Sequence, residues 1–279
     1  MQTSCFEVTY DGAVAQLKFN RPSEKNTLIP AFWSELRDLV TEIDSQSKAR
    51  VIVISSTGKH FSAGLDLSVF DGGMFRGGAE AQQVEPGRRR ALLYQGIRLL
   101  QETFTCIERA RIPVIAAVQG GCVGAAVSLA AACDLRYACQ DAFFLMGEIN
   151  IGITAEVGQL QRLPKVLPEG IVREMAYRGK RLGAERGESV GFINELFADH
   201  ESLVTGVLAI AHEIAEKSPL AVWGAKQSIS FARDHSIESG LEQIALWQAG
   251  MYYPDDCLES MKAKQEGREP DFDDLLKTP

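Results

Sequence analysis

Two carboxylate residues stand alone in a stretch that is otherwise uncharged, apolar and rich in glycine. Glu148 and Glu156 lie eight residues apart within residues 146–158. Burial among apolar groups raises the pKa of a carboxyl, and such a carboxyl can exchange protons near neutral pH. The pair therefore indicates acid–base chemistry. Two structural roles stay open as alternatives: Glu156, just after Thr154, would complement a helix dipole, or Glu148 would be the solvated end of a strand.

Two glycine-rich segments could present backbone amides to a negatively charged oxygen. Residues 119–126 follow a buried strand and lead into a helix of small residues that we predict over 122–131. They match neither a phosphate loop nor a dinucleotide-binding motif. Residues 58–67 also follow a buried strand, and ligands of parallel sheets bind beyond the carboxyl ends of the strands. Together the two segments predict an oxyanion hole, unless the glycines only allow close packing.

Nothing in the sequence is typical of covalent or metal catalysis. The four histidines are isolated, and neither a G-x-S-x-G elbow nor an H-E-x-x-H helix occurs. Ser128 and Cys122 have no evident base nearby in the sequence. The six cysteines lack paired spacing and mostly adjoin apolar residues, which predicts reduced, buried thiols. We therefore expect no metal site.

The elements that must position these groups alternate between strand and helix. Period-2 patterns on either side of Asp11–Gly12 predict a β-hairpin over residues 6–19. Short β-branched runs at 51–54 and 114–118 predict strands buried on both faces. Weaker strands are expected at 135–138 and 142–146, and helical periodicity is seen at 29–47 and 88–109. This order predicts an α/β protein with a largely parallel sheet and helices outside it.

The rest of the chain divides into a loop and a helical end. Residues 71–87 are glycine-rich and weakly patterned, so we expect a mobile surface loop. From about residue 200 the β-branched runs cease, and helices are predicted over 201–216, 219–233, 236–250 and 255–266. We therefore expect a core over residues 1–199 and a helical region over 200–279 that packs on the core or on a neighbouring subunit.

Composition and charge narrow the classes of protein further. The chain has 279 residues, of which 46% are hydrophobic and 24% charged, as in ordinary globular proteins. With 29 Lys and Arg against 37 Asp and Glu, its net charge of −8 argues against nucleic-acid binding. No apolar run approaches the roughly 20 residues of a membrane span. Without signal, transit or peroxisomal sequences at its ends, a cytoplasmic protein is expected.

Several ordered segments resemble the crotonase (enoyl-CoA hydratase/isomerase) superfamily. They are residues 20–26, 61–67, 113–120, 132–136, 161–164 and 218–219. The resemblance runs from about Phe6 to Gly250. It implies a spiral of ββα turns followed by a C-terminal helical trimerisation region. It also implies an acyl-CoA substrate, no cofactor apart from the CoA of that substrate, and a homotrimer or a homohexamer.

The resemblance also implies roles for individual residues. The backbone N–H groups of Leu65 and Ala125 would form the oxyanion hole, although the family usually has glycine at position 125. Arg21 and Lys25 would contact phosphates, unless they are only surface charges. The remaining residues that would cradle the CoA moiety are Ser62, Ala63, Asp66, Leu67 and Gly121.

The acidic residues indicate one branch of the superfamily. Hydratases carry glutamate at position 128, and Ser128 cannot act as the base that activates water, so hydration is expected to be inefficient. Residues 139–144, 147–166 and 233–236 are similar to Δ3,5-Δ2,4-dienoyl-CoA isomerases, in which position 156 is usually aspartate and position 128 often is. The resemblance implies conversion of 3,5-dienoyl-CoA to 2,4-dienoyl-CoA, with Glu148 exchanging a proton at C2 and Glu156 serving C6.

Three other functions remain open at this point. A Δ3-Δ2-enoyl-CoA isomerase would rely on Glu148 alone, and a weak hydratase would use the same oxyanion hole. A non-catalytic crotonase scaffold would bind acyl-CoA or a protein partner without turnover. The two acidic residues in an apolar stretch argue against the scaffold.

Overall fold

The computed structural model describes residues 3–66 and 85–278. Leu67 and residues 71–84 of the expected loop lie outside this description. The end of that predicted loop is wrong, because Pro86 already begins helix α3 (Pro86–Arg109). The Glu85 carboxylate accepts hydrogen bonds from the N–H groups of Gly87 and Arg88, so this residue caps the helix.

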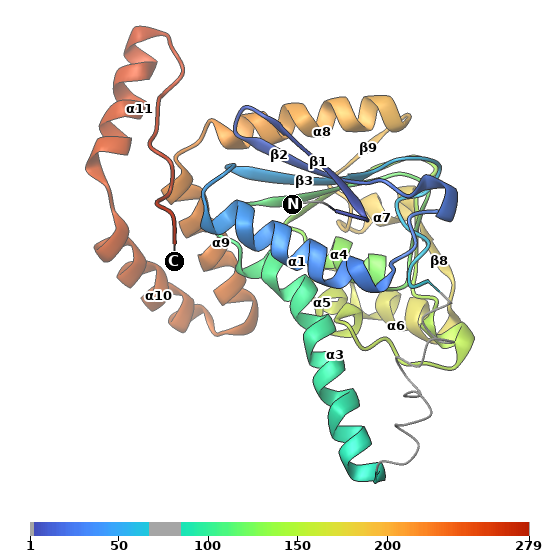
Figure 1. Ribbon diagram of the computed structural model, residues 1–279. Helices are drawn as coiled ribbons and strands as arrows, with labels where there is room; N and C mark the ends of the chain where they lie inside the picture. The colour runs from blue at the N-terminus through green and yellow to red at the C-terminus, as the bar shows by residue number, and fades with distance from the viewer. Residues whose placement is uncertain (1–2, 67–84, 279) are drawn as a thin grey trace.

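A six-stranded sheet forms the centre of the molecule (Figure 1). In spatial order its strands are β1 (Phe6–Asp11), β2 (Val14–Phe19), β3 (Val51–Ser56), β4 (Val114–Val118), β6 (Leu135–Cys139) and β9 (Glu195–Phe197). The first two form the predicted antiparallel hairpin, and all other neighbours in this sheet pair in parallel. The predicted α/β fold with a largely parallel sheet is therefore confirmed.

The structure also contains a smaller, three-stranded sheet. It consists of β5 (Gly121–Val123), β7 (Phe143–Leu145) and β8 (Arg181–Gly183). Because residues 121–123 pair with β7, the helix predicted over 122–131 starts later, as α4 (Ala125–Ala132). This correction matters for the site, since it moves the start of the helix to Ala125.

Helices cover both faces of the large sheet, as Figure 1 shows. Helices α1 (Pro30–Ser45) and α3 share a buried cluster with one face, and α8 (His200–Ala215) packs its Leu203 and Val207 on the other. Three shorter helices lie between β7 and β9 in the chain: α5 (Gln159–Val166), α6 (Glu169–Arg178) and α7 (Ala184–Ser189). The described residues also contain the 3₁₀ turns η1 (Pro22–Glu24) and η3 (Glu148–Ile151).

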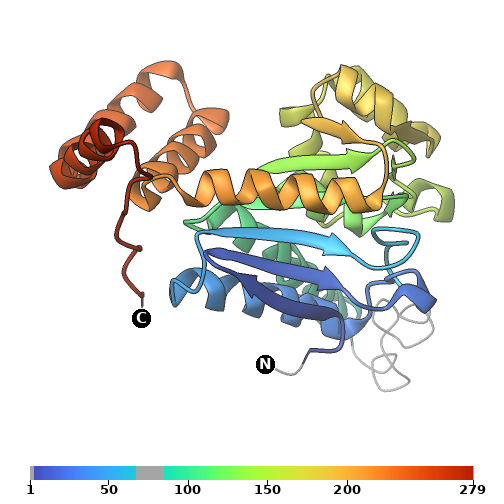
Figure 2. The same cartoon turned by 90° about the horizontal axis from the view of Figure 1, so that it is seen from above.

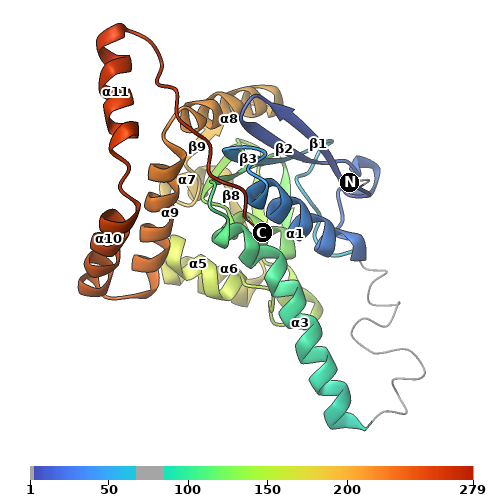
Figure 3. The same cartoon turned by 60° about the vertical axis from the view of Figure 1, so that its left-hand side comes forward.

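The last three helices stand beside the core as a group of their own (Figures 2 and 3). They are α9 (Pro219–Asp234), α10 (Ile237–Met251) and α11 (Pro254–Glu266), which confirms the predicted helices. Buried Lys226 of α9 donates hydrogen bonds to Ile107 O at 2.9 Å, Ile112 O at 3.0 Å and Asp134 Oδ2 at 2.8 Å. Helix α8 belongs to the predicted C-terminal region, yet it packs on the large sheet. The division of the chain into a core over 1–199 and a helical region over 200–279 therefore stays a prediction. No helix in the described ranges is long and apolar enough to cross a membrane.

Candidate active site

The two glycine-rich segments lie side by side at the carboxyl ends of β3 and β4. Ser62 N–H donates to Gly121 O at 3.0 Å, and Val123 N–H donates to Ser62 O at 3.0 Å. Gly64 passes so close that a Cβ there would come within 2.7 Å of Val123 O, and its φ of +86° also favours glycine. The predicted neighbourhood of these segments is thus confirmed.

Residues 25–28 hold the first segment from its other side. Ser62 Oγ donates to Asn26 O at 2.7 Å, and the N–H of Leu28 donates to Gly64 O at 2.8 Å. The Asp66 N–H in turn donates to Leu28 O at 3.2 Å. The two hydrogen bonds with Leu28 use Gly64 O and the Asp66 N–H, on either side of Leu65. They do not use the Leu65 N–H, which is thereby available for a ligand.

The second amide belongs to the start of helix α4. Ala125 is its first residue, so its N–H lacks an acceptor within the helix. Gly124 before it has φ 56° and ψ −128°, a conformation that suits only glycine. The methyl group of Ala125 leaves the backbone N–H unchanged as a donor.

One cavity of about 190 Å³ brings both amide residues and both carboxylates together. Leu65, Ala125, Glu148 and Glu156 all line it, although they come from three separate segments of the chain. The rest of its wall is almost entirely apolar or glycine: Trp33, Ala63, Gly64, Leu100, Val123, Gly124, Gly147, Ile151, Ile153 and Val157. Among the residues that the structure describes, the wall has no cationic side chain, so the carboxylates are the main charges there.

Both carboxyls are shifted towards the range of a proton carrier. Burial raises the pKa of Glu148, while hydrogen bonds from its own backbone N–H and from Gln159 oppose that shift. Burial also raises the pKa of Glu156, and the nearby charge of Glu148 adds to the effect. Glu148 Oε1 accepts a hydrogen bond from Gln159 Nε2 at 2.5 Å, whereas its buried Oε2 has no partner among the described residues. The site can therefore accept and release protons beside two free amides.

The predicted CoA-binding residues lie in and around this cavity. Ala63 is part of its wall, whereas Ser62 and Gly121 are buried in the pairing of the two segments. The Gly121 N–H donates to His60 Nδ1 at 2.9 Å.

Three further predicted CoA contacts also lie outside the cavity wall, within or beside residues 25–28. Arg21 Nη1 donates to Thr27 O at 3.1 Å, and Lys25 is exposed. Asp66 accepts a hydrogen bond from Thr27 Oγ1 at 2.9 Å. Their roles stay predictions, as does that of Leu67, which lies outside the described residues.

Comparison of the sequence with models of protein families shows to which family the chain belongs. Residues 9–275 match the family model described as enoyl-CoA hydratase/isomerase. The chain belongs to the enoyl-CoA hydratase/isomerase family. This membership confirms the resemblance to the crotonase superfamily.

Several members of this family are similar over nearly the whole chain. The mouse protein "Delta(3,5)-Delta(2,4)-dienoyl-CoA isomerase, mitochondrial" is 36% identical over 257 residues, 92% of this chain and 77% of that protein. A peroxisomal protein of the same name from Arabidopsis thaliana is 36% identical over 262 residues, covering 94% and 93% of the two chains.

Solved structures of the family confirm the fold. An enoyl-CoA hydratase from Bacillus anthracis has a TM-score of 0.82 at 28% identity, covering 98% of this chain and 99% of that chain. An enoyl-CoA hydratase described as putative, from Streptomyces coelicolor, has a TM-score of 0.86 at 24% identity and covers 98% and 95%. The chain therefore has the α/β crotonase fold with C-terminal helices.

Three residues of this site, Trp33, Leu100 and Gln159, could not be recognised from the sequence. Trp33 and Leu100 belong to the cavity wall, yet both follow an ordinary amphipathic pattern that marks a core residue equally well. Gln159 contacts Glu148, but a polar residue at the start of a helix gives no signal of burial. Ser128 is fully buried in α4, and its Oγ has no partner among the described residues.

The prediction for the cysteines holds with one exception. All six are free; four of them are buried and Cys106 is half-buried, whereas Cys257 is exposed on α11. Burial raises the pKa of the Cys133 thiol to about 12. In the described part of the chain no cluster of three His, Cys, Asp or Glu could hold a metal ion.

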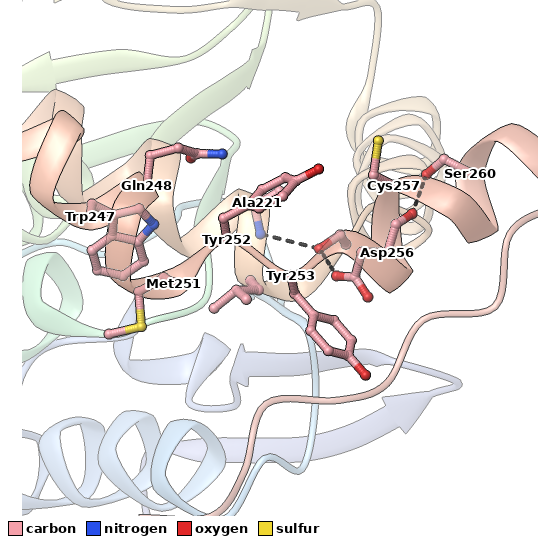
Figure 4. Close-up of a pocket in the computed structure, with 11 residues that line it drawn as sticks. Ala221, Trp247, Gln248, Met251, Tyr252, Tyr253, Asp256, Cys257 and Ser260 are labelled. Carbon is pink, nitrogen blue, oxygen red and sulfur yellow. Dashed lines mark hydrogen bonds between the residues drawn. The ribbon is translucent and has the colours of Figure 1, made fainter.

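A second cavity, of about 230 Å³, lies among the C-terminal helices (Figure 4). Aromatic residues Trp247, Tyr252 and Tyr253 line it, and Ser218 Oγ donates to Asp256 Oδ2 at 2.5 Å beside them. None of the predicted site residues that the structure describes belongs to its wall. It is therefore separate from the candidate active site.

Proposed function

We propose that the protein is an isomerase that converts a 3,5-dienoyl-CoA into the 2,4-dienoyl-CoA. The observation that carries this proposal is the presence of two carboxyls with raised pKa values in one apolar cavity with two available amides. Isomerisation over four carbons needs a proton removed at C2 and a proton added at C6. The names of the mouse and Arabidopsis relatives support the same reaction.

In this mechanism the thioester carbonyl accepts hydrogen bonds from the N–H groups of Leu65 and Ala125. They stabilise the negative charge of the dienolate, which lowers the barrier to loss of the C2 proton. Glu148 is the base at C2, since the hydrogen bond from Gln159 favours its ionised form. Glu156 is the acid at C6, because the charge of Glu148 favours its protonated form. Turnover leaves Glu148 protonated and Glu156 ionised, and proton exchange with water restores the starting state.

The CoA moiety is proposed to lie along residues 21–28 and 62–66. Arg21 and Lys25 would meet its phosphates, which an acidic protein of net charge −8 must neutralise locally. Ser62, Ala63 and Gly121 would shape the passage of the pantetheine chain.

A turnover assay tests the reaction. Wild-type protein is expected to convert 3,5-octadienoyl-CoA into the 2,4-dienoyl thioester, which is followed by the long-wavelength absorbance of that product. This rate is expected to exceed the rate at which the protein hydrates a 2-enoyl-CoA. Glu148→Gln and Glu156→Gln are each expected to lower kcat by about 10²–10⁴-fold, since each removes one proton carrier. The exposed Glu188→Gln serves as the control.

The outcomes separate the candidate functions. If both glutamine variants keep wild-type rates, the two-carboxyl mechanism is wrong. If only Glu148→Gln is impaired, a single-base Δ3-Δ2 isomerase is favoured. Binding of acyl-CoA without any turnover would instead support a scaffold.

Isotope exchange tests the assignment of the two carboxyls. In D₂O, Glu156→Gln is expected to keep exchange at C2 of the bound substrate, whereas Glu148→Gln loses it. The reverse pattern would exchange the two roles.

A further inference from the structure

Gln159 joins the two halves of the candidate site through one amino group. It is the first residue of α5 and is fully buried, with 0% of its surface exposed. Its Nε2 donates to Gly124 O at 2.9 Å and to Glu148 Oε1 at 2.5 Å. The two hydrogens of this one group are thus divided between the oxyanion-hole segment and a carboxylate.

The contact with Gly124 acts on the proposed oxyanion hole itself. Gly124 C=O and Ala125 N–H belong to the same peptide group, which is planar. A donor at the carbonyl end therefore helps to fix the direction of the N–H, and it polarises the peptide so that the N–H donates more strongly. Val127 N–H also donates to Gly124 O, at 2.8 Å, so the carbonyl is held from two directions.

The contact with Glu148 acts on the proposed base. A hydrogen bond to the ionised carboxylate opposes the effect of burial on its pKa. It also occupies Oε1 and leaves Oε2 without a protein partner among the described residues. The backbone at Gly124 lies close to the same carboxylate, since a Cβ there would come 3.5 Å from Glu148 Oε1.

The orientation of the Gln159 amide follows from these contacts. Both neighbours, Gly124 O and ionised Glu148, are acceptors, so a flipped amide would face oxygen with oxygen. The Oε1 atom of Gln159 is left buried without a partner in the described part of the chain. An unsatisfied acceptor is costly to bury, which argues for a requirement for the amino group at this place.

We propose that Gln159 is a positioning residue that aligns the Ala125 amide and the Glu148 carboxylate on one substrate. The reaction that Gln159 would assist is the proposed isomerisation, so this inference rests on the proposed function. The hydrogen bonds of Gln159 to Gly124 O and Glu148 Oε1 are independent of it. Gln159 acts through Gly124 and Glu148 and does not line the cavity.

The test compares Gln159→Met, which keeps the length of the side chain but donates no hydrogen bond, with Gln161→Met. Gln161 is an exposed glutamine of the same helix and serves as the matched control. Gln159→Met is expected to lower kcat about 10- to 100-fold with a small change in KM, since it removes a hydrogen bond to a charged group. The acidic limb of the kcat profile is expected to move to higher pH, because Glu148 loses a donor.

A spectroscopic measurement reports on the oxyanion hole without turnover. The carbonyl ¹³C shift of bound [1-¹³C]2,4-hexadienoyl-CoA is expected to move towards the free value in Gln159→Met and to stay unchanged in Gln161→Met. Gln159→Leu, which also lacks a donor, should give the same changes and serves if Gln159→Met does not fold.

Unchanged kcat, pH limb and carbonyl shift in folded variants of Gln159 would overturn the proposal. If the wild type does not isomerise 3,5-octadienoyl-CoA, the proposed function fails. In that case the carbonyl shift still decides the role of Gln159, because it requires only binding.

Discussion

Glu148 and Glu156 share one apolar cavity, so the ionisation of each depends on burial, and that of Glu156 also on the charge of Glu148. Glu148 accepts a hydrogen bond from Gln159, and in the proposed mechanism this difference distinguishes the base from the acid. Two residues of the same type thereby have raised pKa values that differ in their causes.

The raised pKa of Glu148 has a consequence for stability. Its pKa in the folded protein lies above that in the unfolded chain, so the folded state binds more protons at intermediate pH. The stabilising contribution is complete below the unfolded value and is lost as the pH rises through the folded one. Glu148→Gln does not titrate, so its free energy of unfolding relative to the wild type should rise as the pH increases from the ordinary glutamate pKa of about 4.3 towards neutrality.

Urea unfolding at several pH values measures this difference. Glu188→Gln, at an exposed carboxylate, serves as the control for a general effect of charge. A difference between Glu148→Gln and wild type that is constant with pH would contradict the raised pKa.

At the scale of elements, the close passage of the two glycine-rich segments determines where the amides lie. Gly64 approaches Val123 O, and Ser62 pairs with the strand β5. Because these contacts are made by the backbone, side-chain changes along the segments can be tolerated, as Ala125 illustrates. The glycines themselves cannot be replaced in this way.

Gly64→Ala is expected to lower both stability and activity. The added Cβ would lie 2.7 Å from Val123 O, and the alanine would have to adopt a φ of +86°. Together we expect a loss of about 2–4 kcal/mol in the free energy of unfolding, and a lower kcat because the Leu65 N–H is displaced. Thermal melts and the isomerase assay measure the two effects.

Gly12→Ala is the matched control for this change. Gly12 has a φ of +55° but nothing within 4 Å of an added Cβ, so it experiences the backbone strain without the collision. Equal losses in stability and kcat for both variants would contradict the importance of the close passage.

Most elements could be predicted from the sequence because their patterns are local. The hairpin around Asp11–Gly12, the buried runs of β3 and β4 and the C-terminal helices all carry a clear period. The strand β5 was hidden, since its three residues look like the start of a helix until they pair with β7. Gln159 was hidden for a related reason: its partners Gly124 and Glu148 lie 35 and 11 residues away in the chain.

At the scale of the whole molecule, the C-terminal helices present apolar side chains that the chain itself does not cover. On α10, Ile237, Leu241 and Leu246 are 83%, 64% and 69% exposed, and Leu258 and Met261 of α11 are 60% and 58% exposed. Exposed apolar side chains in this number favour association. We propose that these helices join subunits into a trimer or hexamer.

Replacing two of these side chains tests the assembly. At micromolar concentration the wild type is expected to sediment as a trimer or hexamer. The double variant Leu241→Asp with Leu246→Asp would place charges in the proposed apolar contact, so it is expected to sediment as a monomer. Tyr10→Asp, at a residue 48% exposed on the hairpin, should leave the assembly unchanged. A monomeric wild type would refute this role of the helices.

The pairing of Ser62 with Cys122 joins segments about sixty residues apart, which bears on how the protein acquires its activity. Helices form from local contacts, whereas parallel pairing over such a separation requires closing a long loop. After dilution from urea, the helical circular-dichroism signal should therefore return before isomerase activity does. A newly made chain would pass through a helical stage in which neither amide faces a substrate, and it would become an enzyme only when this last junction closes.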